Sequence, residues 1–141
     1  MLRDVIEHLP RPIKALENVW QMLRPGECAY IEFLPYYSAF GGHQQYRRHP
    51  YIVVALVKND EPEYLEEICV FEQCKLTLKY FEKIVKTLEF SIVCKEFFLS
   101  RPIWKRRYGV LVIRLKYAAQ ILCLRELLVT VAIYLLKKRE D

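Results

Sequence analysis

Two stretches of the chain carry apolar side chains at helical spacing. The first predicts a helix that begins at Pro12 and ends at the breaker Arg24-Pro25-Gly26. Its apolar face consists of Ile13, Leu16, Val19, Trp20 and Leu23. The second predicts a helix from an N-cap at Thr77 to about Leu88. Its inward face consists of Phe81, Ile84, Val85 and Leu88.

Short apolar runs predict strands around these helices, at residues 1–6, 28–34, 91–98 and 129–136. The order strand, helix, strand over residues 1–34, with short connections, predicts a βαβ unit with parallel strands. Residues 35–75 are less regular and form an expected insert. We therefore expect an α/β fold class and a single domain that covers residues 1–141.

Composition narrows the function classes. A chain of 141 residues with 53% hydrophobic residues can build one core and is not a disordered tail. Its four glycines never form a G-x-G. The glycine-rich turn that lets a nucleotide approach the backbone is therefore absent from this sequence.

The net charge of +5 is too diffuse to indicate nucleic acid, which makes a nucleic-acid partner unexpected. The basic residues gather between Lys95 and Lys116, where seven of them meet one acid, Glu96, among interleaved aromatic residues. Two interpretations stay open for this segment. It forms either a solvated rim or a face that meets an anionic membrane surface or an acidic substrate.

Cysteine usage and hydropathy bear on location. The five cysteines are odd in number and contain no C-x-x-C, which favours reduced, mostly buried thiols and a cytoplasmic protein. Residues 117–136 are long enough to span a membrane. Arg125 and Glu126 fall near their centre, where a charge is costly, so we expect no transmembrane segment.

Several motifs in order resemble one family. Residues 4–10 (DVIEHLP) and 23–27 (LRPGE) resemble the D-x-x-E-H and L-K/R-P-G-G strings of class I S-adenosylmethionine-dependent methyltransferases. Residues 35–43 resemble that family's P-x-x-S-x-x-G-G-H loop, and residues 76–90 its L-T helix. Residues 125–137 resemble its closing strand. The resemblance covers nearly the whole chain but only the second half of the family's domain.

The resemblance implies a partial Rossmann-like sheet, with parallel strands and an antiparallel closing strand. The family's N-terminal strands and glycine-rich motif, which hold most of the cofactor, are missing. It implies the C-terminal part of a methyltransferase that uses S-adenosylmethionine and acts on an unidentified small-molecule or lipid-linked acceptor. We expect this chain alone to be inactive.

Site residues follow from the same resemblance. Asp4, Val5 and Ile6 would border the cofactor, and Glu7 or His8 would be the catalytic base. Two structural alternatives stay open: Glu7 caps the next helix, and His8 is a hydrogen-bonded turn residue. A lid over the acceptor would consist of Tyr36, Tyr37, Phe40, Gly41, Gly42 and His43.

A metal site is a further, less favoured hypothesis. Asp4, Glu7, His8 and His43 offer the oxygen and nitrogen ligands of metal-dependent O-methyltransferases. The D-x-x-E-H string also occurs in relatives that need no metal, so none is favoured here.

A rival function needs no catalysis. A degenerate half-domain would act as an interaction module, and it would self-associate through an exposed strand at residues 1–6. Alternatively, it would lie peripherally on a membrane by its basic-aromatic segment.

Overall fold

The computed structural model describes residues 1–37, 75–109, 111–116 and 121–139. Four strands form one mixed sheet in the order β1-β2-β4-β3. They are β1 (Leu2–Arg3), β2 (Cys28–Phe33), β3 (Phe90–Phe98) and β4 (Val131–Lys138). β1 pairs parallel with β2, and β4 runs antiparallel to both β2 and β3. The predicted α/β class and the parallel βαβ unit are confirmed.

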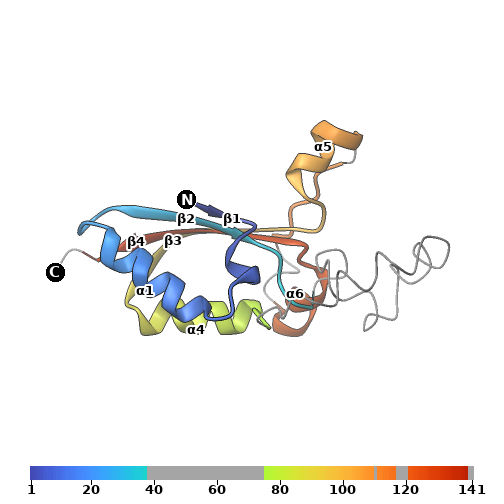
Figure 1. Cartoon of the computed structure of the whole chain (residues 1–141). Helices are drawn as coiled ribbons and strands as arrows, with labels where there is room; N and C mark the ends of the chain where they lie inside the picture. The colour runs from blue at the N-terminus through green and yellow to red at the C-terminus, as the bar shows by residue number, and fades with distance from the viewer. Residues whose placement is uncertain (38–74, 110, 117–120, 140–141) are drawn as a thin grey trace, which may run out of the picture.

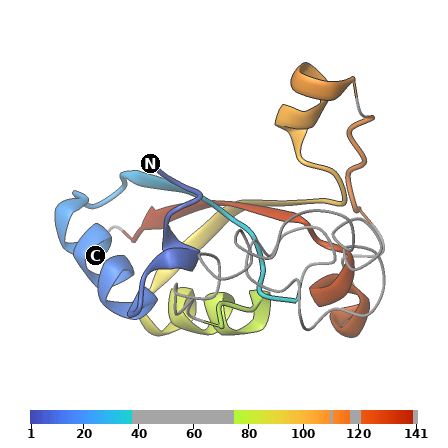
Figure 2. The same cartoon turned by 45° about the vertical axis from the view of Figure 1, so that its right-hand side comes forward.

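The helices divide between the two sides of the sheet. Helices α1 (Pro12–Met22) and α4 (Leu78–Thr87) and the 3-10 turn η1 (Ile6–His8) lie on one side. Helix α6 (Leu122–Leu128) lies near the end of that layer, whereas α5 (Pro102–Tyr108) projects on the opposite side (Figures 1 and 2). Helices α1 and α4 agree with the apolar spacing of the sequence, whereas the two shorter helices were not predicted from it.

The core lies between the sheet and the helices α1 and α4. Phe33 of β2, Phe81 of α4 and Tyr134 of β4 are fully buried, and the Phe81 ring centroid lies 4.7 Å from each of the other two. Leu16 is the fully buried anchor of α1, while Ile13 on the predicted apolar face is 41% exposed. Burial of each such large side chain stabilises the fold by roughly 1.5–3 kcal/mol. These contacts hold the carboxyl ends of β1 and β2 in place.

Two expectations were wrong in detail. Residues 1–6 are not one buried strand, because Asp4 takes a positive φ of 50°, which ends β1 after Arg3. Residues 125–127 belong to α6 and not to the closing strand, which begins at Val131 where the β-branched residues start. Of the five thiols expected to be reduced and mostly buried, those of Cys28 and Cys94 are free and exposed, since both strand positions face away from the core.

The start of α4 has two sets of acceptors. Thr77 Oγ1 accepts from the Tyr80 amide at 3.1 Å, which confirms the predicted N-cap. The carboxylate of Glu126 also accepts from the amides of Leu78 and Lys79, at 3.0 and 2.8 Å. Both sets satisfy helix amides that have no partner within the helix.

Thr77→Ala is therefore expected to lower the free energy of unfolding by about 1 kcal/mol, since it leaves the Tyr80 amide without its acceptor. The matched control is Thr87→Ala, because the exposed Thr87 hydroxyl only donates to the Lys83 carbonyl at 3.0 Å. Its cost should stay below about 0.5 kcal/mol. Urea unfolding followed by circular dichroism measures both. Equal costs would show that Thr77 is not acting as a cap.

Candidate functional site

The predicted cofactor-side residues lie just after β1, next to the end of β2. Asp4 follows β1 directly, residues 6–8 form η1, and Leu34 follows β2. The Asp4 amide donates to the Glu32 carbonyl at 3.0 Å, which ties this turn to the neighbouring strand. In open α/β sheets, ligands bind beyond the carboxyl ends of parallel strands. The location is therefore suited to a binding site.

Asp4 carries a strained backbone and an ion pair. Its φ of 50° lies in the left-handed region, which aspartate tolerates better than most residues. Asp4 Oδ2 accepts from a guanidinium nitrogen of Arg101, the residue before α5. Asp4 Oδ1 and Arg101 Nε are buried, and neither has a hydrogen-bond partner among the described residues. Such unpaired buried atoms are uncommon, and each normally has a partner, which can be an ordered water, an ion or a ligand.

Glu7 is a buried carboxyl group with little compensation. Glu7 is 4% exposed, and its Oε1 accepts a long hydrogen bond of 3.4 Å from the Leu34 amide. Oε2 is buried and has no partner within the described part of the chain. Burial raises the pKa of Glu7 to about 7, and the negative charge of Asp4 adds to that effect, while hydrogen bonds from the Glu7 and Leu34 amides and the charge of Arg101 oppose it.

A carboxyl group with a pKa of about 7 exchanges its proton near neutral pH. General acids and bases need this property, and exposed glutamates lack it. The alternative that Glu7 caps α1 is wrong. The N-cap of that helix is Arg11, and no side chain there makes a capping hydrogen bond.

The other predicted residues of this group lie in different environments. Ile6 is fully buried in the core, Val5 is 40% exposed, and His8 is exposed at the end of η1. Arg101 belongs to the basic segment 95–116, and the sequence did not predict that it pairs with Asp4. The only feature of the local sequence that could have pointed to Arg101 is its position between β3 and Pro102. Its contact with Asp4 joins residues 97 positions apart.

Only the first part of the predicted lid is described. The rings of Tyr36 and Tyr37 meet edge to face at 5.0 Å, and the Tyr36 amide donates to the Leu76 carbonyl at 3.0 Å. Phe40, Gly41, Gly42 and His43 lie outside the described residues. Within the residues that the structure describes, no group of three His, Cys, Asp or Glu side chains is placed to hold a metal ion.

The basic residues between Lys95 and Lys116 have different partners and exposures. Lys95 pairs with Glu82 at 3.2 Å, Arg101 pairs with Asp4, and Arg114 pairs with Glu96. Lys105 and Arg106 of α5 are exposed.

In the described part of the chain, no helix is both long and apolar enough to cross a membrane. No protein-family model matches the chain, and no curated protein matches it either.

Proposed function

We propose that this chain forms the C-terminal part of a class I S-adenosylmethionine-dependent methyltransferase, and that Glu7 is its catalytic base. The observation that carries the proposal is the group formed by the buried Glu7 and the partly buried ion pair of Asp4 and Arg101, at the carboxyl ends of parallel strands. The antiparallel β4 between β2 and β3 agrees with the closing strand that the sequence resemblance implies.

The buried polar atoms are compatible with the cofactor. Asp4 Oδ1 and Glu7 Oε2 are acceptors without described partners, and they suit the cationic and hydroxyl groups of S-adenosylmethionine. When bound, the cofactor supplies an activated methyl group on a sulfonium. The glycine-rich turn is absent from the 141 residues, so this chain offers one side of the cofactor site and should bind weakly.

Glu7 supplies the proton chemistry in this proposal. An acceptor hydroxyl or amine must lose a proton for methyl transfer, and a carboxylate with a pKa of about 7 takes it up near neutral pH. Asp4 and Arg101 position the turn in front of η1, and burial in the core holds Ile6 and the backbone beside it in place. His8 is the second candidate for the base. The acceptor, a small molecule or a lipid-linked compound, would lie near Tyr36 and Tyr37.

A non-catalytic interaction module in the cytoplasm or at a membrane surface is the second candidate. The sheet face opposite α1 and α4 favours it, since α5 is the only described helix on that side (Figure 1). Tyr30, Ile133 and Leu135 are half-buried on this face. The predicted self-association through β1 has less support, because that edge has only two residues and Arg3 is exposed.

Backbone amide NMR of the labelled chain, titrated with S-adenosylhomocysteine, tests the proposal. We expect progressive shifts at residues 4–7, with a dissociation constant on the order of 1 mM. Asp4→Asn should abolish them, and Glu17→Gln on α1, a matched loss of one acidic charge, should not. No shift at residues 4–7 up to about 10 mM, or equal effects of the two variants, would contradict the proposal. Line broadening at residues 1–6 that depends only on protein concentration would favour the interaction module.

A further inference from the structure

Helix α5 and the chain on either side of it form an arm that projects from the sheet, the α5 arm (residues 101–113). The arm leaves the end of β3 on the face opposite α1 and α4, and in both views α5 stands apart from the other described helices and strands (Figures 1 and 2). Its two ends are held together. The Ser100 hydroxyl donates to the Leu111 carbonyl at 2.6 Å and accepts from the Ile113 amide at 2.9 Å. The α5 arm is therefore an element anchored at both ends, with α5 presented away from the core.

The α5 arm lies in the most basic part of the chain. Between Glu96 and Glu126 the sequence contains no acidic residue. The same stretch includes three consecutive basic residues, 105–107, all of them in α5. An element with positive charges and no negative ones is complementary to an anionic partner.

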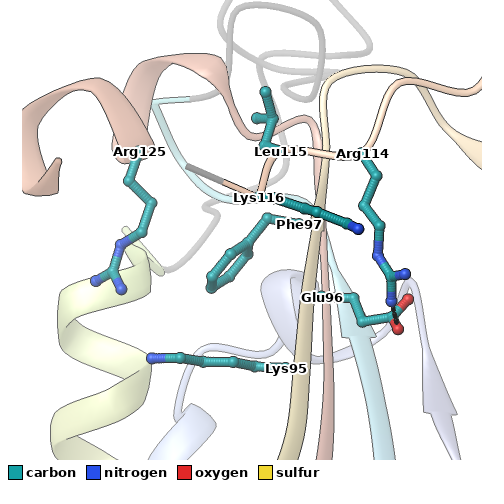
Figure 3. A pocket seen from close by; sticks show the side chains of 7 residues that line it. All are labelled: Lys95, Glu96, Phe97, Arg114, Leu115, Lys116 and Arg125. Atoms are coloured by element: carbon teal, nitrogen blue, oxygen red, sulfur yellow. Dashed lines mark ion pairs between the residues drawn. The ribbon is translucent and has the colours of Figure 1, made fainter. Parts of the chain in front are cut away.

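The charges at the base of the α5 arm have partners within the fold. Arg101, where the arm begins, pairs with Asp4. Arg114, which follows the arm, pairs with Glu96 of β3 (Figure 3). By contrast, the Lys105 and Arg106 side chains of α5 are exposed and make no ion pair with any residue that the structure describes. The charges on α5 are therefore available to a partner.

Apolar side chains are exposed on the same arm. Ile103 of α5 is 43% exposed, and Leu111 and Ile113 of the returning segment are 73% and 41% exposed. At Gly109, which ends α5, an added Cβ would meet nothing within 4 Å, so this end of the helix faces open space. Nucleic acids are bound mainly through charge, whereas the boundary of a bilayer accepts basic and apolar side chains together. The combination favours a lipid surface.

We propose that the α5 arm docks this protein on an anionic phospholipid bilayer. Lys105 and Arg106 would lie among the lipid headgroups, and Ile103 would enter the boundary with the acyl chains. Seven residues are too few to cross a bilayer, so the contact is peripheral. The inference is independent of the proposed methyl transfer, because none of residues 4–8 contributes to this surface.

Sedimentation of the full chain with lipid vesicles tests the role of the charges. Phosphatidylcholine vesicles with about 30 mol% phosphatidylserine should bind at least about tenfold more tightly than pure phosphatidylcholine, and salt should weaken the binding. Lys105→Gln with Arg106→Gln should weaken it about 30-fold, since each cation near an anionic membrane contributes about fivefold. The matched control is Lys83→Gln with Lys86→Gln, which removes two charges from exposed positions of α4 on the other side of the sheet. Its affinity should stay within about threefold of the wild type.

A second pair of variants tests the apolar contact. Ile103→Asn should weaken binding to the anionic vesicles about tenfold. Its control is Ile13→Asn, because Ile13 also follows a proline at the start of a helix and is 41% exposed, but lies on α1. That variant should bind as the wild type does.

Three results would overturn the proposal. One is the absence of binding to the anionic vesicles up to about 5 mM lipid. Another is an equal loss of affinity in the α5 and α4 charge variants. The third is tighter binding to a single-stranded oligonucleotide than to the anionic vesicles, with Ile103→Asn equal to the wild type on both, which would indicate a nucleic-acid partner instead.

Discussion

Glu7→Gln is expected to stabilise the folded chain at pH 8, by up to about 3 kcal/mol. Burial raises the pKa of Glu7 from 4.5 to about 7, so the folded protein must hold an ionised carboxylate in a poor environment above pH 7. Glutamine keeps an oxygen for the Leu34 amide and removes that charge.

The pH dependence distinguishes this effect from ordinary repacking. Because the folded pKa of Glu7 exceeds the unfolded value, the folded state binds the proton more tightly. The stability contribution of this group is fully present below about pH 4.5 and is lost as the pH rises to about 7. The advantage of Glu7→Gln should therefore be close to zero at pH 4.5, grow through this window and level off above pH 7.

Urea unfolding of the wild type and the variant between pH 4 and 8 measures this difference. Glu17→Gln is the control, because its partly exposed carboxylate pairs with Lys14 at the surface, and the change should stay within about 0.5 kcal/mol at every pH. A Glu7→Gln variant that is less stable than the wild type at pH 8 would contradict the picture of an uncompensated carboxylate. A residue that costs stability in this way is characteristic of functional sites.

Glu82→Ala is expected to lower the free energy of unfolding by about 3–5 kcal/mol. The Glu82 carboxylate accepts from both terminal nitrogens of Arg125 and from the Tyr134 hydroxyl at 3.0 Å. Burial alone would raise the pKa of Glu82, but hydrogen bonds and charges from Arg125 and Lys95 outweigh it and lower that pKa. Removal of the carboxylate leaves the Arg125 charge buried without a partner.

Two variants separate the buried pair from its exposed neighbour. Lys95→Ala should cost less than about 1 kcal/mol, because that side chain is 45% exposed and its pair is screened by solvent. The double variant Glu82→Leu with Arg125→Met should recover part of the stability, since it replaces both charges by apolar groups but still leaves the buried Tyr134 hydroxyl without its acceptor. Denaturant unfolding of the wild type, the two single variants and the double variant measures these differences in stability. If Glu82→Ala lowers the free energy of unfolding no more than Lys95→Ala does, the contacts of Glu82 with Arg125 and Tyr134 do not hold α4 and α6 to the sheet.

Local features of the sequence were sufficient for most of the fold. The apolar spacing of residues 13–23 and 81–88 and the N-cap at Thr77 depend on neighbours within a few positions, and α1 and α4 are where that spacing placed them. Helices α5 and α6 were missed because each has only seven residues, too short for periodicity to be evident. Pro102 at the start of α5 and Gly109 at its end, with a φ of 70°, were the available signals.

By itself, the sequence determined the α/β class, the parallel βαβ unit, the two main helices and the absence of a glycine-rich turn. Each of these features depends on residues that lie close together along the chain. Only the tertiary structure decided which charges are buried and with what partners. Glu82 meets Arg125 across 43 positions and Tyr134 across 52, and Asp4 meets Arg101 across 97. The order β1-β2-β4-β3 brings distant segments together, and the pKa of Glu7 depends on solvent exclusion that no local pattern contains.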